Sequence, residues 1–374
     1  MAIYLINTFL SCFFVYLGTR NEKKKWNIWV LLAIVIPCVI AGARDVTVGT
    51  DTSVYIKPLF TYATQVSSLE RYINASITEP GFLLYVYFVT KLTGSMFWVC
   101  FGIELWCMMF VYISLIDNGS GKYTWIGFLA YHLLFYSFTL NLMRQFMGLS
   151  FGLYCFKYIK QRKLLKYYLN ITAIVILVHR MSFVFYITYP MYYFLTHNEI
   201  QGVIGFFKRS YKTLFKLLII VGTLFVVIFA SNFMSIISYI FGNYQGQIDN
   251  IQKFSIVWTN LFFMIPLSLP FILNQKYLIS CCKDFDFYNT CFIVATILWQ
   301  LQGLSRESYR VSFYFFYFII LMLPLLIKHL KRKSDRVIYL GYYIIGMSLY
   351  YYIYFVFQLF NNTYPYTSQM LGIG

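Results

Sequence analysis

Apolar segments of about 20 residues recur along almost the whole chain, and they limit most strongly what it can fold into. A helix needs about 20 residues to cross the hydrocarbon core of a bilayer. Thirteen such segments fall at about 2–19, 27–43, 80–93, 96–116, 123–140, 144–160, 165–179, 182–196, 214–236, 255–273, 287–304, 311–327 and 337–359. Only 11% of the residues are charged, against about 25% in a soluble domain. The sequence therefore predicts an all-α integral membrane protein and excludes a soluble enzyme, a disordered chain and a disulfide-rich secreted domain.

The charges between these segments are mostly basic. The chain holds 30 Lys and Arg against 13 Asp and Glu, a net charge of +17. In a soluble protein this excess would suggest a nucleic-acid partner, but in a membrane protein it indicates loops retained in the cytoplasm. The basic clusters lie at 20–25, 157–166, 208–216 and 328–336. We assign all four to the cytoplasmic side and expect no nucleic-acid partner.

If every segment crossed the membrane, the basic clusters at 20–25 and 157–166 would lie on opposite sides. The two clusters share one side only if one segment before residue 157 does not cross. The segment 80–93 is the shortest candidate, with about 14 apolar residues between Glu79-Pro80 and Gly94. A segment of 10–14 residues is more typical of a re-entrant or interfacial helix. We therefore predict about 12 transmembrane helices plus this one, in a single membrane domain over 1–374, with both termini and the loop 44–79 extracytoplasmic. Segments 165–179 and 182–196 are short, with a break at His179–Ser182.

Nine basic residues fall on the outer side and need an explanation other than topology. They are Arg44, Lys57, Arg71, Lys91, Arg144, Arg180, Lys253, Arg306 and Arg310. Several of them gather with acidic and amide side chains at the outer ends of unrelated helices. The functional cavity is therefore expected to open on the extracytoplasmic side.

The string RDVTVGTDTSVY at 44–55 is the most specific local pattern. Locally it could form an Asx-type turn with an ion pair between Arg44 and Asp45. Alternatively, Arg44 binds a phosphate through its planar fork and Asp51 accepts hydrogen bonds from sugar hydroxyls. Both interpretations stay open from the residues alone.

Other outer residues carry the same pair of interpretations. Arg144 could snorkel to the membrane surface, or it could bind an anion at the start of its helix. Arg306 and Arg310 stand four apart and would share one helix face suited to a diphosphate, although Glu307 could neutralise one of them. His179 beside Arg180 titrates near neutral pH and could act as a base.

One acid and several missing motifs complete the pattern. Glu104 lies inside the apolar segment 96–116, where a carboxylate is costly and is usually paired or functional; the sequence does not identify its partner. The chain lacks a phosphate-binding loop, a zinc-protease motif and a nucleophile elbow. Asp284-Phe285-Asp286 is interpreted as a solvated loop. We expect no metal site and no cofactor.

Five motifs in order resemble the EpsG family of Wzy-type polysaccharide polymerases. They are RDVTVGTDTSVY, Glu79-Pro80-Gly81-Phe82, Met143-Arg144-Gln145, His179 with Ser182, and Arg310 before Phe313-Tyr314-Phe315. The resemblance implies a GT-C-like membrane enzyme, independent of metal and nucleotide, in the bacterial inner membrane. Such an enzyme joins oligosaccharide repeats carried on polyprenyl diphosphate at the outer face. By position it marks Arg44, Gly49, Asp51, Tyr55, Glu79, Arg144, Gln145, His179 and Arg310.

The resulting hypothesis is a polymerase for an O-antigen, capsule or exopolysaccharide. Its expected partners are undecaprenyl-diphosphate-linked oligosaccharides and membrane lipid, with a chain-length regulator and a flippase as candidates. The predicted catalytic residues are His179, Asp51 and Arg144, with His179 the first choice of base. The predicted substrate-binding residues are Arg44, Tyr55, Glu79, Gln145, Arg180, Arg306 and Arg310. The alternatives are a lipid-linked oligosaccharide flippase and a membrane glycosyltransferase that uses a polyprenyl-phosphate sugar.

Overall fold

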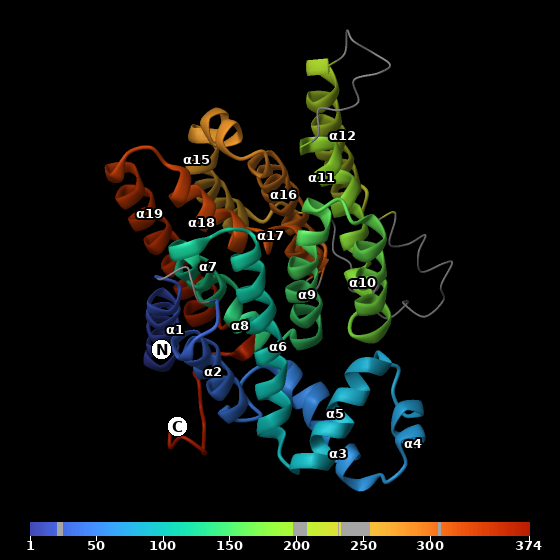
Figure 1. Cartoon of the computed structure of the whole chain (residues 1–374). Coiled ribbons are helices and arrows are strands. Elements are labelled where there is room, and N and C mark those ends of the chain that lie inside the picture. The colour runs from blue at the N-terminus through green and yellow to red at the C-terminus, as the bar shows by residue number, and fades with distance from the viewer. Residues whose placement is uncertain (21–24, 197–207, 231, 233–254, 306–307) are drawn as a thin grey trace. The chain divides into compact units, whose positions relative to one another are not determined.

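The computed structural model describes residues 1–374 except 21–24, 197–207, 231, 233–254 and 306–307 (Figure 1). The described residues form helices joined by turns, with one isolated β-bridge between Ser368 and Ile373. This confirms the all-α prediction. The chain divides into two compact units, one of residues 1–183 with 323–374 and the other of residues 184–322.

The first unit contains most of the helices named below. They are α1 (Ala2–Thr19), α2 (Ile28–Ala43), η1 (Thr52–Ile56), α3 (Lys57–Gln65), α4 (Leu69–Asn74), α5 (Pro80–Thr93), α6 (Met96–Asp117), η2 (Gly121–Tyr123), α7 (Thr124–Ala130), η3 (Tyr131–Phe135), α8 (Tyr136–Thr139), α9 (Met143–Lys160), α10 (Leu164–Leu177), α19 (Lys333–Tyr351), η8 (Tyr352–Phe357) and η9 (Phe360–Asn362).

Seven helices among the described residues lie wholly within the second unit. They are α11 (Thr188–Thr196), α12 (Lys208–Ile228), α15 (Trp258–Cys281), α16 (Asp284–Trp299), η6 (Gln300–Gly303), η7 (Ser308–Ser312) and α17 (Phe313–Phe316). Two helices run across the boundary between the units, η4 (Arg180–Ile187) and α18 (Ile319–His329).

Five stretches among the described residues are long and apolar enough to cross a membrane. They are Ala2–Thr19, Met96–Asp117, Trp258–Cys281, Ser308–His329 and Lys333–Phe357, and the shorter apolar helices Ile28–Ala43 and Leu164–Leu177 accompany them. This agrees with a helical membrane protein. The count of 12 crossings and the outward termini stay predictions, because several predicted segments are interrupted. For example, 123–140 changes to a wider helical turn at Tyr131–Phe135.

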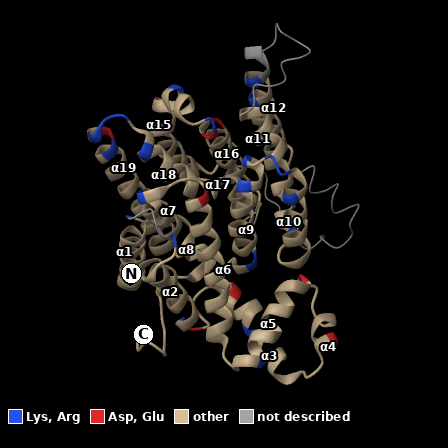
Figure 2. Ribbon diagram, in the orientation of Figure 1, with Lys and Arg blue, Asp and Glu red and all other residues tan. Residues whose placement is uncertain are grey.

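Basic turns gather at one end of the first unit. Lys160 Nζ, at the end of α9, donates to Asn118 Oδ1 after α6 at 3.0 Å. Lys328 Nζ, at the end of α18, donates to the Gly119 carbonyl at 2.7 Å. The turns that follow α6, α9 and α18 therefore meet. Helix α9 carries basic residues at this end and also at its other end (Figure 2). The meeting of these basic turns is what a shared cytoplasmic face requires.

The opposite end of the first unit holds both chain termini. Tyr4 Oη in the first turn of α1 donates to the Thr363 carbonyl at 2.5 Å. Gly42 near the end of α2 lies against Phe97 near the start of α6. Helix α9 connects the two ends with 18 residues, or about 27 Å at 1.5 Å per residue. That length is close to the thickness of a hydrocarbon core.

Helix α5 has the bounds expected for segment 80–93, Pro80–Thr93. It packs against α3 and α4 (Figure 1). Tyr87 Oη donates to the Ser67 carbonyl at 2.7 Å, and Tyr85 Oη donates to the Val99 carbonyl in the first turn of α6 at 2.7 Å. The flank of α5 that carries Tyr85 therefore adjoins the end of the unit that holds the termini. Its re-entrant placement in a membrane stays a prediction.

The predicted break at His179–Ser182 is confirmed. Helix α10 ends at Leu177 and η4 begins at Arg180. Ser182 is fully buried, and a Cβ on Gly148 of α9 would lie 2.4 Å from its Oγ. The glycine lets the broken segment approach the α9 backbone. This contact brings His179 beside the helix that carries Arg144.

The turn at 45–52 depends on Gly49. Its φ of 85° is in the left-handed region, which L side chains avoid at a cost of about 1–2 kcal/mol. A Cβ at this position would also lie 2.8 Å from the Leu140 carbonyl oxygen.

Gly49→Ala is expected to destabilise the protein more than Gly94→Ala. Gly94 also has a positive φ of 62°, but a Cβ there would meet nothing within 4 Å. Gly94→Ala therefore carries the backbone term of about 1–2 kcal/mol alone, and Gly49→Ala adds the clash. Thermal melting of the detergent-purified variants measures the difference. Equal shifts in melting temperature would contradict the close approach to Leu140.

Candidate functional site

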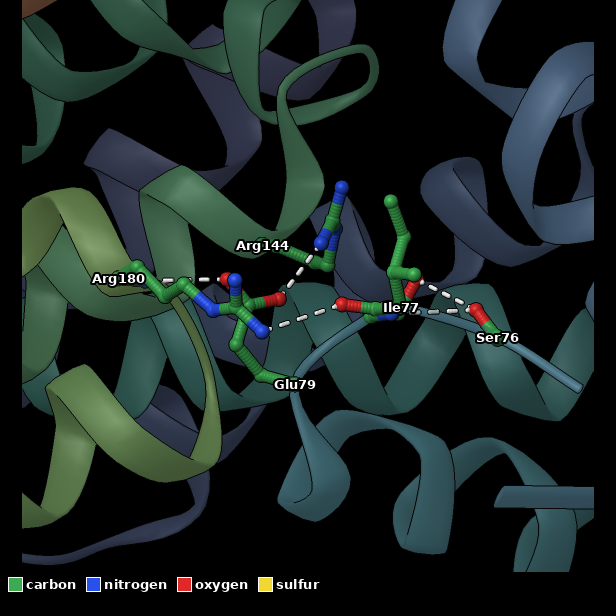
Figure 3. A network of polar contacts seen from close by, with 6 residues as sticks. Ser76, Ile77, Glu79, Arg144 and Arg180 are labelled. Atoms are coloured by element: carbon green, nitrogen blue, oxygen red, sulfur yellow. Dashed lines mark hydrogen bonds and ion pairs between the residues drawn. The ribbon is translucent and has the colours of Figure 1, made fainter. Parts of the chain in front are cut away.

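A buried carboxylate, Glu79, is the centre of the candidate site (Figure 3). It precedes α5 and is 5% exposed. Its Oε2 pairs with Arg144 Nη1 at 2.6 Å, and its Oε1 accepts a hydrogen bond from the Arg180 backbone N–H at 3.0 Å. One side chain thus joins the start of α5, the first turn of α9 and the break after α10.

Arg144 is held from three directions. Glu79 binds one guanidinium nitrogen, and the rings of Tyr55 and Phe82 lie 5.4 Å and 5.9 Å from its Cζ atom. These distances are within the range of cation–π attraction. The side chain keeps 26% of its surface exposed. Arg144 is therefore a fixed cation that an approaching ligand can still contact.

Arg180 presents a second cation beside the first. The residue is exposed, and its Nη2 donates to the Ile77 carbonyl at 3.4 Å. The turn before Glu79 is ordered by Ser76, whose Oγ donates to Thr78 Oγ1 at 2.9 Å and accepts from the Thr78 backbone N–H at 3.2 Å. The backbone of Arg180 is fixed by Glu79 while its guanidinium faces outward.

His179 lies next to this cluster. It is half-buried, its backbone N–H donates to the Ile174 carbonyl at 3.0 Å, and its carbonyl accepts from the Ser182 N–H at 3.0 Å. Its Cβ lies 3.6 Å from the position of a Cβ on Gly148. Because Gly148 is one helical turn beyond Arg144, the histidine lies along the same face of α9 as that arginine.

The charge of Glu79 follows from its surroundings. Burial alone would raise the pKa of the carboxyl group, but hydrogen bonds from the backbone N–H groups of Arg180 and of Glu79 itself, with the charges of Arg144 and His179, bring the net pKa below its ordinary value of 4.5. Glu79 is ionised at neutral pH. The cluster of one carboxylate and two guanidinium groups therefore retains a net positive charge.

Arg44 is buried and turns inward. It is 5% exposed, and its Nη2 donates to Thr52 Oγ1 and to the Leu140 carbonyl, both at 3.2 Å. Its Nη1 donates to the Ala41 carbonyl. These hydrogen bonds attach the 44–52 turn to the segment before α9. Its predicted role in phosphate binding stays a prediction, and the described contacts assign it a structural task.

Asp51 lies where the 44–52 turn contacts the segment before α9. It is half-buried, and its backbone N–H donates to Asn141 Oδ1 at 2.8 Å. Tyr55, one turn further along η1, is 46% exposed and faces Arg144. Gln145 follows Arg144 and is 5% exposed. These predicted residues therefore lie on neighbouring elements around Arg144.

The structure identifies the partners of the buried acid in α6. Glu104 is 1% exposed, and it accepts from Tyr131 Oη at 2.5 Å and from Thr139 Oγ1 at 2.7 Å. The two hydroxyl groups come from η3 and α8. A carboxyl group satisfied in this way stabilises the packing of the first unit.

Two of the predicted substrate-binding arginines, Arg306 and Arg310, come late in the chain. Arg310 lies in η7, in the second unit, and is half-buried. Arg306 lies outside the described residues. The site described here is accordingly built from the first unit alone. Among the described residues, no group of three or more His, Cys, Asp or Glu side chains could hold a metal ion.

Sequence reasoning missed two contributors. Phe82 supplies one of the rings against Arg144, and Asn141 accepts from both Thr50 Oγ1 and the Asp51 N–H. Asn141 carried a signal, because it is an isolated amide between two apolar segments and stands three residues before Arg144. Phe82 was part of a motif, but one aromatic among 39 phenylalanines is not distinctive.

The ion pair is expected to make stability pH-dependent at acidic pH. Because folding lowers the pKa of Glu79, the pair stabilises the fold above the unfolded value of about 4.3, and this contribution is lost as the pH falls through the folded pKa. Glu79→Gln should destabilise the protein by about 1–3 kcal/mol at pH 7. Melting temperatures of both proteins between pH 3 and pH 8 measure this. Parallel curves would contradict the lowered pKa.

Comparison with known proteins places these residues in context. The family model described as "EpsG family" matches residues 27–368, nearly the whole chain. Searches of curated proteins and of solved structures found no match. EpsG-type proteins are Wzy-like polysaccharide polymerases. With its all-helical fold and its apolar helices of membrane-spanning length, the chain belongs to the EpsG family.

Proposed function

We propose that the protein polymerises oligosaccharide repeat units carried on polyprenyl diphosphate. The observation that carries this proposal is the cluster of Glu79, Arg144 and Arg180, with Tyr55 stacked over Arg144. A net positive site with an exposed aromatic ring suits a ligand that joins a diphosphate to a sugar. Membership of a family of polysaccharide polymerases supports the same substrate class.

The reaction joins a donor glycan to an acceptor hydroxyl. The hydroxyl oxygen of the acceptor forms a bond to the anomeric carbon of the donor, the bond from that carbon to the phosphate oxygen breaks, and the lipid diphosphate leaves with the electron pair. Charge develops on the leaving diphosphate. Arg144 and Arg180 stabilise that charge, and fixed donors of this kind contribute about 10²–10³ to the rate.

The acceptor hydroxyl must lose a proton as the bond forms. His179 is our first choice of base because it lies one turn along α9 from Arg144 and beside Glu79. Histidine is the side chain most often used for proton transfer near neutral pH. Asp51, in the turn that contacts the segment before α9, is the second choice of base. Tyr55, Gln145 and Glu79 then orient the substrate around the reacting atoms.

The reaction is assigned to the outer face of the bacterial inner membrane. Lys160 and Lys328 mark the basic end of the first unit, which we assign to the cytoplasm. Glu79 and Arg144 lie at the opposite end of α9. The substrate would be an undecaprenyl-diphosphate-linked oligosaccharide supplied by a flippase. The product would be an O-antigen, capsule or exopolysaccharide, whose length a regulator could set.

Loss of Arg144 or of His179 is expected to stop polymerisation. In a strain lacking the chromosomal gene, Arg144→Ala and His179→Ala should leave lipid-linked single repeats and no long polymer, because leaving-group stabilisation or proton transfer is lost. Gel electrophoresis of surface glycans and mass spectrometry of extracted lipids provide the measurement. Arg71→Ala is the matched control, since Arg71 is an exposed arginine in α4 whose side chain makes no hydrogen bond or ion pair with the described residues.

Immunoblots of the membrane fraction confirm that each variant is inserted. Normal polymer length from both the Arg144 and the His179 variants would refute the site. The leaflet of the accumulated repeats tests the class of protein. A polymerase defect leaves them accessible to enzymes added outside the inner membrane of spheroplasts, whereas accumulation on the cytoplasmic leaflet would indicate a flippase. A change in repeat composition without a change in length would indicate a single-sugar transferase.

Arg144→Lys tests whether geometry matters beyond charge. Lysine keeps the positive charge but lacks the planar fork that can bind Glu79 and a phosphate together and stack between Tyr55 and Phe82. Turnover of lipid-linked repeats by the purified variant is expected to fall about tenfold, a loss of about 1.4 kcal/mol of transition-state stabilisation. Turnover equal to that of the wild type would show that only the charge is used.

A further inference from the structure

Residues near the C-terminus form hydrogen bonds with the turn that carries Asp51. We call residues 359–373 the C-terminal segment. The Gly49 N–H donates to the Asn362 carbonyl at 2.9 Å, and the Asp45 N–H donates to the Thr367 carbonyl at 3.0 Å. Asp45 Oδ1 also accepts from the Gln369 N–H at 2.9 Å. The C-terminal segment thus fixes the turn 45–51 at two separate points.

Asn141 connects this segment to the candidate site. Its side chain is buried, with Asn141 1% exposed. Its Oδ1 accepts from the Asp51 N–H at 2.8 Å and from Thr50 Oγ1 at 2.9 Å. Its Nδ2 donates to Asn361 Oδ1 at 3.1 Å. Because Asn141 stands three residues before Arg144, it couples the Asp51 turn to the start of α9.

The Asp51 backbone N–H determines which way the Asn141 amide points, because a backbone N–H can only donate. An amide has one accepting and one donating end of nearly the same shape. Its accepting end is directed at Asp51 and Thr50, and its donating end then faces Asn361 Oδ1. Without Asn361 Oδ1 the buried Asn141 NH₂ group loses this acceptor, and Asn141 loses its side-chain hydrogen bond to the C-terminal segment.

The backbone around Asn361 adopts an uncommon left-handed conformation. Leu359, Asn361 and Asn362 have φ angles of 51°, 67° and 52°. Side-chain-bearing residues are uncommon in this left-handed region, and asparagine is among those that enter it most readily. Residues held in such conformations persist where the surrounding structure fixes them, and they cluster at functional sites.

We infer that Asn361 is a positioning residue of the polymerase site. Through Asn141 it holds the Asp51 turn against the start of α9, and with it the place of Asp51 relative to Arg144. Asn361 acts without touching the substrate itself. The inference rests on the proposed function, because it assigns a task to Asn361 within that reaction.

The test compares three variants at neighbouring positions. Asn361→Gly removes the acceptor and keeps the left-handed backbone, which glycine adopts without strain. Asn361→Asp restores an acceptor for Asn141 Nδ2. Asn362→Gly is the matched control, since it removes an exposed side chain and keeps the carbonyl that binds Gly49. Turnover is measured on detergent-purified protein with lipid-linked repeats extracted from a strain that lacks this gene.

Asn361→Gly is expected to lower kcat by about tenfold to a hundredfold, the scale of a misplacement of about 1 Å in an active site. Asn361→Asp should recover most of the lost turnover, and Asn362→Gly should match the wild type. Recovery by aspartate is the readout that general damage to the segment would not produce.

Three results would overturn the inference. They are wild-type turnover from Asn361→Gly, no recovery from Asn361→Asp, and an equal loss from Asn362→Gly. A different failure concerns the proposed function. If the wild-type protein itself makes no polymer from lipid-linked repeats, the polymerase assignment fails, whatever the Asn361 variants do.

Discussion

The pairing of Glu79 with Arg144 is the constraint on which the arrangement of the candidate site depends. A carboxylate that is 5% exposed is costly unless charges and hydrogen bonds replace its water. Glu79 meets this requirement with a guanidinium from α9 and a backbone N–H from the break after α10. Three segments far apart in the sequence are therefore held at one point, because each supplies a group that the buried carboxylate needs.

The same pairing prepares the site electrostatically. Glu79 neutralises one of the two arginines and leaves a net positive charge, while Tyr55 and Phe82 restrict the Arg144 side chain. A fixed cation needs little rearrangement when negative charge develops on a leaving group, and this is the origin of large electrostatic contributions to rate. Glu79 is thus better suited to hold the arginine than to bind the diphosphate, which it would repel.

The sequence predicted the helical class, the bounds of α5 and the break at His179–Ser182. These features follow from the length of the apolar segments and from the polar, proline and glycine residues that interrupt them. It also predicted that Glu79, Arg144, His179 and Arg180 lie on one face, since charge sorting between loops places their segments together. It did not predict the inward direction of Arg44 or the partners of Glu104. Those depend on which carbonyl and hydroxyl groups packing brings within reach, and helical periodicity does not contain that information.

Helix α9 shows why the two kinds of positive charge in this chain must be explained separately. Lys157 and Lys160 lie at its last turn and Arg144 at its first. The 16 residue steps from Arg144 to Lys160 correspond to about 24 Å along the helix axis. The lysines face the basic turns and fit a rule of membrane orientation. Arg144 lies at the other end of the helix, where it is bound to Glu79. A basic residue that is paired with a buried acid and still partly exposed stays accessible to a ligand with negative charge, and for this reason the proposed function rests on Arg144.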